Sequence, residues 1–114
     1  MSNEKPFGDV EASLEKTGRV DELIKLYESR SREVPKADEA AHLLCRAADL
    51  SREKLKNATR AEELFRRARG YRPNAREALE GLRVIFEARS DFAALAEVLE
   101  RLGLVQAGPA AAAI

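Results

Sequence analysis

The sequence has little of what disulfide-stabilised and metal-dependent proteins require. It contains one cysteine and one histidine in 114 residues, which excludes an internal disulfide framework and a metal site built from several histidines. Tryptophan is absent and aromatic residues make up only 5% of the chain, so a core must consist of aliphatic residues and alanine. With six glycines and four prolines, the composition also argues against a loop-rich all-β fold.

No excess of either charge is present. Twenty basic residues balance twenty acidic ones, so non-specific binding to nucleic acid or to a membrane has no global electrostatic drive. No apolar run approaches the roughly 18 residues of a membrane-spanning helix, and no apolar leader follows the N-terminal charges. We therefore expect a cytoplasmic protein without membrane contact, and a lone thiol is typical of a reducing compartment.

Apolar residues recur three and four positions apart, which is typical of helices, whereas the alternation expected of strands is nearly absent. Helix stops and starts come from glycine, proline and short capping motifs, namely Gly18, Pro35, Lys56-Asn57, Thr59-x-x-Glu62, Gly70, Pro73, Asn74-x-x-Glu77 and Ser90-Asp91. These signals predict an all-α fold with helices over about 6–17, 20–33, 37–55, 60–70, 75–89 and 91–102.

One apolar pattern occurs three times along the chain. Spacings of three and four residues relate Phe7, Val10 and Leu14, then Ala41, Leu44 and Ala48, then Leu79, Leu82 and Phe86. The alternate helices share a second pattern, seen in Leu23-x3-Tyr27, Ala61-x3-Phe65 and Leu95-x3-Leu99. The repeat step is 34 residues from position 7 to position 41 and 38 from position 41 to position 79. This difference places a four-residue insertion, about one helical turn, in the third helix or just after it.

This helix–turn–helix unit resembles the tetratricopeptide repeat. The second unit matches the family best, with Ala61, Phe65, Ala68 and Pro73 at the positions of its alanine, aromatic, alanine and proline residues. The resemblance implies one domain over residues 1–114, a right-handed superhelix of about three antiparallel helix pairs. The units would span about 4–37, 38–75 and 76–109, with a short apolar tail at 103–114. Three stacked units are about the minimum that buries a continuous core.

The resemblance also implies a concave groove, lined by the first helix of each unit, that receives a peptide or a partner helix. Carried over by position, the groove residues are Lys5, Lys16, Glu39, His42, Arg46, Asp49, Glu77, Glu80, Val84 and Glu87. The basic clamp of the chaperone-binding members is absent, since Gly8, Ala12, Glu77 and Gly81 stand at its positions. We expect a groove that runs from basic to acidic, and a ligand that carries lysine or arginine at the acidic end.

No motif for catalysis or metal binding stands out from the helical pattern. Cys45 lies near His42 and Asp49 in sequence, but it occupies a small-residue position of the repeat, where a free cysteine behaves as a buried small hydrophobe. No CxxC motif, second histidine or glycine-rich phosphate loop accompanies it. We therefore predict a scaffold or adaptor that binds a protein or peptide, is not an enzyme, and uses no cofactor and no metal.

Two alternatives remain open. Residues 60–76 contain six arginines, which favours an RNA-binding helical module, although pairs such as Glu62–Arg66, Glu63–Arg67 and Glu97–Arg101 predict an ordinary solvated face. The last helix is predicted to leave Phe92, Ala94 and Val98 outside the core, which favours a homodimer or a segment of a longer repeat array. The sequence does not identify the partner, the pathway or the oligomeric state.

Overall fold

The computed structural model describes residues 6–103, and these residues form helices without any strand. The elements are α1 (Phe7–Lys16), α2 (Val20–Glu33), α3 (Ala37–Glu53), α4 (Ala58–Tyr71), α5 (Arg76–Arg89) and α6 (Phe92–Arg101). The all-α prediction is confirmed, and every expected helix is present. Of the helices described, none combines the length and the apolar character that crossing a membrane requires.

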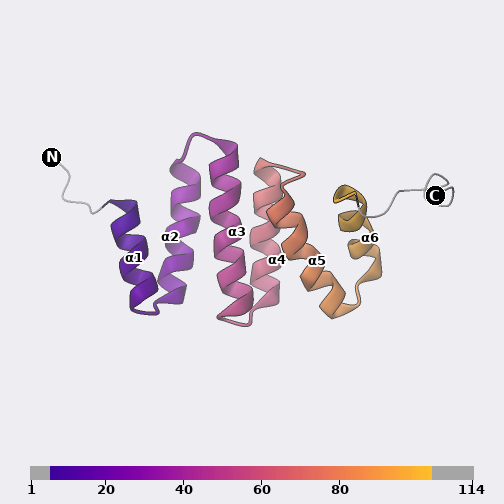
Figure 1. Ribbon diagram of the computed structural model, residues 1–114, viewed down its shortest axis with the longest axis horizontal. Coiled ribbons are helices and arrows are strands. Elements are labelled where there is room, and N and C mark those ends of the chain that lie inside the picture. Colours follow the sequence, from indigo (N-terminus) through magenta and orange to yellow (C-terminus); the bar gives the residue numbers. More distant parts are fainter. Residues whose placement is uncertain (1–5, 104–114) are drawn as a thin grey trace.

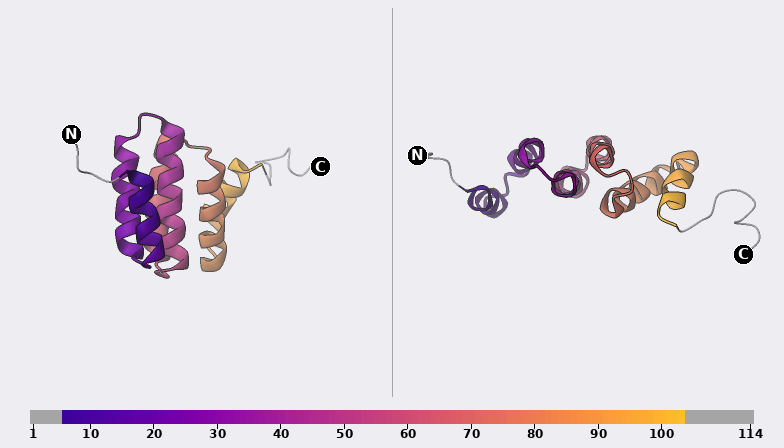
Figure 2. Two further views of the ribbon diagram at one scale, coloured as in Figure 1. Left: turned by 60° about the vertical axis from the view of Figure 1, so that its left-hand side comes forward. Right: turned by 90° about the horizontal axis from the view of Figure 1, so that it is seen from above.

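The helices stand side by side in chain order (Figure 1). Seen from above, the row follows a zigzag in which α1, α3 and α5 lie in one layer while α2 and α4 lie in the other (Figure 2). Each helix packs against the next one in the chain, and α3 also contacts α5 directly. This arrangement gives the molecule one face formed by α1, α3 and α5.

The repeated apolar positions form the core between the two layers. In α3 and α5 all of them are buried, namely Ala41, Leu44, Ala48, Leu79, Leu82 and Phe86. The aromatic positions of α2 and α4, Tyr27 and Phe65, have no exposed surface. The corresponding positions of α1, at Phe7, Val10 and Leu14, are only partly buried, because the backbone of α1 comes close to that of α2 alone.

The turn between α3 and α4 differs from the expected one. Lys56 adopts a left-handed conformation with φ 53°, and Asn57 caps α4 by accepting a hydrogen bond from the Arg60 N–H at 3.0 Å. The predicted Thr59–Glu62 capping box is therefore wrong, since Thr59 already lies inside α4. As the insertion predicts, α3 is the longest helix, with 17 residues.

Other helix ends follow the sequence signals in part. Gly18, with φ 69°, follows the end of α1 as predicted, and Asp91 caps α6 by accepting from the Ala94 N–H at 3.4 Å. Asn74 does not cap α5, because the N-cap position belongs to Ala75, which makes no side-chain hydrogen bond. Gly70 does not end α4, which continues to Tyr71 and stops at the extended residue before Pro73.

Close contact between α4 and α5 depends on Gly81. A Cβ atom at this position would lie 2.1 Å from Cζ of Phe65, far inside the contact distance of two carbon atoms. Gly81 is buried beneath the Phe65 ring.

The inward face of α6 is rotated relative to the expected one. Val98 has no exposed surface and belongs to the core, and Ala94, Leu95 and Leu102 are partly buried and pack against that core. The prediction that Val98 lies outside the core is wrong, because positions 95, 98 and 102 form a helical stripe as regular as positions 95, 99 and 102. Phe92 is 72% exposed, as expected.

Candidate functional site: a cleft along α3

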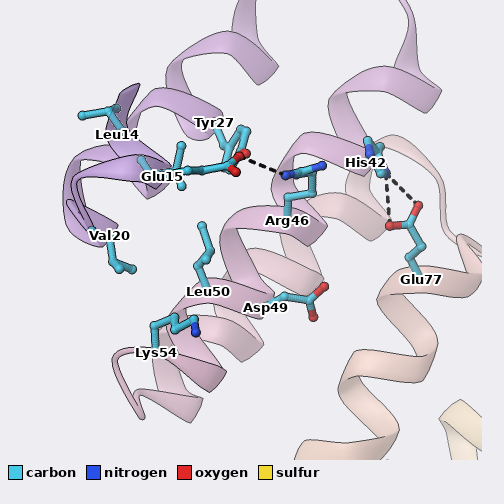
Figure 3. A pocket seen from close by; sticks show the side chains of 12 residues that line it. Leu14, Glu15, Val20, Tyr27, His42, Arg46, Asp49, Leu50, Lys54 and Glu77 are labelled. Carbon is cyan, nitrogen blue, oxygen red and sulfur yellow. Dashed lines mark hydrogen bonds and ion pairs between the residues drawn. The ribbon is translucent and has the colours of Figure 1, made fainter. Parts of the chain in front are cut away.

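A cleft of about 690 Å³ opens on the face of α1, α3 and α5, and we call it the α3 cleft (Figure 3). Its apolar wall comes from the end of α1, the start of α2 and the middle of α3, through Leu14, Val20, Leu23 and Leu50. Its polar and charged groups lie mainly on α3, at intervals of about one helical turn: His42, Arg46, Asp49 and Lys54. Together they form an apolar surface bordered by charges.

The α3 cleft brings together four of the residues predicted for a groove, namely His42, Arg46, Asp49 and Glu77. Five others are not among its lining residues, namely Lys16, Glu39, Glu80, Val84 and Glu87. Lys5 lies outside the described residues. The sequence pattern did not indicate the apolar wall, because Leu14 was assigned to the repeated core pattern and Val20 and Leu50 belong to no repeated position.

The acidic end expected on α5 is largely neutralised. Arg83 donates hydrogen bonds to Glu80 at 3.0 Å and to Glu87 at 2.7 Å. Glu77 instead faces α3, where both of its carboxylate oxygens lie 2.9 and 3.1 Å from Nδ1 of His42. The three glutamates therefore do not present one acidic surface, and the His42–Glu77 pair links α3 to α5.

Arg46 holds α1 against α3 across the α3 cleft. Its Nη2 atom lies 3.5 Å from a carboxylate oxygen of Glu11 and 3.6 Å from one of Glu15. The guanidinium group also stacks over the Tyr27 ring, 5.2 Å from the ring centroid, in a cation–π arrangement. The Tyr27 hydroxyl donates a hydrogen bond to Glu11. Arg46 thus has its charge satisfied within the protein.

Burial raises the pKa of the Tyr27 hydroxyl, and the hydrogen bond to Glu11 raises it further. The nearby Arg46 guanidinium opposes this shift without cancelling it. The hydroxyl therefore stays protonated at neutral pH and remains a hydrogen-bond donor. Its role is to orient Glu11 toward Arg46.

Asp49 is the acidic residue of the α3 cleft that has no contacting partner among the described residues, since Glu15 pairs with Arg46 and Glu77 with His42. It is partly buried, and within residues 6–103 no hydrogen bond or ion pair reaches its carboxylate. Burial raises the pKa of Asp49 and the negative charges of Glu53 and Glu77 raise it further, while the charges of Arg52 and Arg46 oppose this shift without cancelling it. The side chain points from α3 toward the α5 side of the cleft (Figure 3).

Cys45 lies on α3, is not among the residues that line the α3 cleft, and is only 1% exposed, as predicted. Burial raises the pKa of its thiol to about 12, with smaller contributions from Glu77 and Asp49. The thiol is therefore protonated at neutral pH, and a protonated buried thiol is a poor nucleophile and a poor metal ligand. Within residues 6–103 no three metal-ligating side chains come together.

The arginines of residues 60–76 are mostly engaged in ion pairs. Glu28 accepts hydrogen bonds from two of them, Arg60 at 2.9 Å and Arg67 at 2.7 Å. This contact replaces the predicted Glu63–Arg67 pair and connects α4 to α2. Three more arginines of this segment form ion pairs, namely Arg66–Glu62, Arg69–Glu97 and Arg72–Asp38. Two arginines outside it share the same glutamates, in the pairs Arg89–Glu62 and Arg101–Glu97. Of all these pairs, Arg66–Glu62 and Arg101–Glu97 were predicted.

Three glutamates, Glu28, Glu62 and Glu97, each pair with two arginines, at least one of which lies on another helix. Burial alone would raise the pKa of Glu28 and Glu62, but the hydrogen bonds from their arginines outweigh it and lower both values. The hydrogen bond from Arg69 is the main cause that lowers the pKa of Glu97. Most of the arginine charge is thus compensated within the fold.

Comparison of the chain with protein-family models, with curated proteins and with solved structures finds no match.

Proposed function

We propose that the chain is a non-catalytic protein–protein interaction module of the tetratricopeptide-repeat type, which binds a polypeptide segment on the face of α1, α3 and α5. The α3 cleft carries this proposal. It combines partly exposed aliphatic side chains with charged groups at its border, which is the composition of surfaces that recognise peptides by apolar anchoring and polar selection.

The arrangement of the helices supports the repeat interpretation. The first helices of the proposed units share one layer, and the ion pairs of Arg46 with α1 and of His42 with α5 connect them. The second helices are connected by Glu28 and Arg67 between α2 and α4. A right-handed superhelix of about three helix pairs accounts for both sets of contacts.

A binding role agrees better with the cleft than a catalytic one does. Arg46, His42 and Glu77 are already paired with one another or with neighbouring side chains, so they are held in place rather than available for proton transfer. The buried thiol of Cys45 offers no nucleophile. The remaining polar groups at the border of the cleft are suited to recognition.

The two alternatives receive less support from the contacts. An RNA-binding surface needs arginines that are free to meet phosphates, yet five of the six in residues 60–76 are paired with carboxylates. A homodimer through α6 would have to use Phe92 without Val98, since Val98 is buried. We therefore propose partner binding on the α3 side of the molecule.

Site-specific photo-crosslinking tests this proposal. A benzophenone amino acid is placed at Lys54, in the α3 cleft, or at Glu63, an exposed position of α4 in the other layer. In an extract of the native source, we expect a discrete protein adduct from position 54 and none of that size from position 63. Adducts of equal yield from both positions, or from neither, would contradict binding at this face.

A further inference from the structure

We propose that the α3 cleft selects segments in which a lysine or arginine stands close to an aliphatic residue. The cation would pair with Asp49, and the aliphatic side chain would pack on Leu14, Val20 and Leu50. This inference rests on the proposed function and adds to it the chemical class of the partner segment.

The selection of a cation follows from the charges left unpaired. Arg46 is engaged by Glu11 and Glu15, and His42 is engaged by Glu77. Asp49 has no such partner in the described part of the chain, although it is partly buried. A carboxylate that is withdrawn from water and unpaired gains most from a bound cation.

The neighbours of Asp49 strengthen this preference. The charges of Glu53 and Glu77 disfavour the ionised form of Asp49, whereas those of Arg52 and Arg46 favour it without forming an ion pair with it. A basic ligand residue would supply the contacting cation that Asp49 lacks among the described residues, and an acidic one would not. Lysine and arginine carry their charge at the end of a long apolar stem. Such a side chain can reach Asp49 while its stem stays against the wall of the cleft.

The apolar half of the cleft lies on the other side of α3. Asp49 and Leu50 are adjacent in sequence and diverge by about 100° around the helix, so Leu50 points toward the α1 side whereas Asp49 points toward α5 (Figure 3). Leu14, Val20 and Leu50 are each only partly buried. They leave an aliphatic surface that a ligand side chain can cover.

Lys54 favours one orientation of a bound segment in the α3 cleft. It lies one helical turn beyond Leu50 and also lines the cleft. A cation bound near Leu50 would meet the like charge of Lys54, whereas a cation at Asp49 meets carboxylates. The basic residue of a ligand is therefore placed on the α5 side of its aliphatic neighbour.

The effect of replacing Asp49 on stability distinguishes a role in ligand binding from a role in folding. Its unpaired charge opposes folding, because burial and the neighbouring carboxylates disfavour the ionised form. Replacement by asparagine keeps the shape of the side chain and removes the charge. A structural role predicts that this change lowers stability, whereas a recognition role predicts that it weakens binding without lowering stability.

The experiment uses the full chain and a random dodecapeptide library displayed on phage. Selections are run in parallel on the wild type, on Asp49→Asn and on Glu63→Gln, a charge-removing control at an exposed position of α4. We expect the wild type and the control to enrich lysine or arginine close to leucine, isoleucine or valine. Asp49→Asn should keep the aliphatic preference and lose the basic one.

A selected peptide and its lysine-to-norleucine analogue then quantify the contact by fluorescence anisotropy. With the wild type, the analogue should bind about tenfold more weakly, the size expected for one charge-assisted hydrogen bond. With Asp49→Asn, both peptides should bind alike. Enriched peptides without a basic residue, or a basic preference that persists in Asp49→Asn, would overturn the inference while leaving peptide binding intact. No enrichment on any variant would overturn the proposed function as well.

Discussion

Replacement of Gly81 by alanine is expected to destabilise the protein, although the same change within a helix normally stabilises it. Alanine has the higher helix propensity, and the gain in a helix interior is about 1 kcal/mol. At Gly81, however, the new Cβ atom would stand 2.1 Å from Cζ and 2.5 Å from both Cε atoms of Phe65. The sign of the effect therefore depends on whether the ring can move.

The surroundings of Phe65 leave the ring little room. Its side chain has no exposed surface and lies in the core between α4 and α5. Carbon atoms in contact are about 3.5–4.0 Å apart, so the ring or α5 must shift by more than 1 Å. Overpacking of this kind costs about 3 kcal/mol at the upper end of its usual range. After subtraction of the helix-propensity gain, we expect a net loss of about 2 kcal/mol.

Urea unfolding followed by circular dichroism measures the effect, and Gly70→Ala is the matched control. Gly70 also lies in a helix, but a Cβ atom there would meet no heavy atom within 4 Å. We expect Gly70→Ala to stabilise the protein by up to about 1 kcal/mol. Thermal unfolding should show a decrease in Tm of about 10 °C for Gly81→Ala.

A double mutant shows whether Phe65 is the cause. Phe65→Leu removes the ring edge that the new Cβ atom would meet, so the effect of Gly81→Ala should become smaller in that background. Equal effects in the two backgrounds would show that Phe65 is not involved. If Gly81→Ala matches Gly70→Ala in stability, the close approach of α4 and α5 described above is incorrect.

Four further outcomes are expected. The pKa values of Glu28, Glu62 and Glu97 are lowered from about 4.5, so their ion pairs stabilise the fold above that pH and this contribution is lost as the pH falls through the lowered values. Urea titrations from pH 7 to pH 2 should show the decrease in the free energy of unfolding. Replacement of all three glutamates by glutamine should make that decrease smaller. Asp49→Asn should raise the urea midpoint at pH 7, since the pKa of Asp49 is raised, and this gain should vanish below pH 3.8. A lower midpoint at pH 7 would show that the charge of Asp49 stabilises the fold and therefore has a partner. The thiol of Cys45, with a pKa of about 12, should react with a soluble disulfide reagent only after unfolding, so rapid labelling of the native protein would exclude its burial. Arg46→Ala should accelerate amide exchange in α1, which has no buried residue of its own, while exchange in α5 stays unchanged.

The helices and their repetition follow from local signals along the chain. Apolar spacing, glycine, proline and capping residues act within a few positions of one another, so they locate helix ends without knowledge of the fold. The bounds of α2 agree with the prediction at both ends, and the four-residue insertion accounts for the length of α3. The apolar character of Tyr27 and Phe65, at equivalent repeat positions, likewise predicted their burial.

Only the tertiary structure decided which charges remain free. Long arginine side chains reach partners far away in sequence, as Arg67 does when it pairs with Glu28 instead of Glu63, and local spacing cannot choose between such partners. For the same reason the sequence placed Arg46 and Asp49 equally in a groove. The fold brings two carboxylates into contact with Arg46, whereas the charges of Arg46 and Arg52 act on Asp49 without an ion pair among the described residues. The distinction between a paired and an unpaired charge arises when α1, α3 and α5 come together, and the proposed selection of a basic partner depends on it.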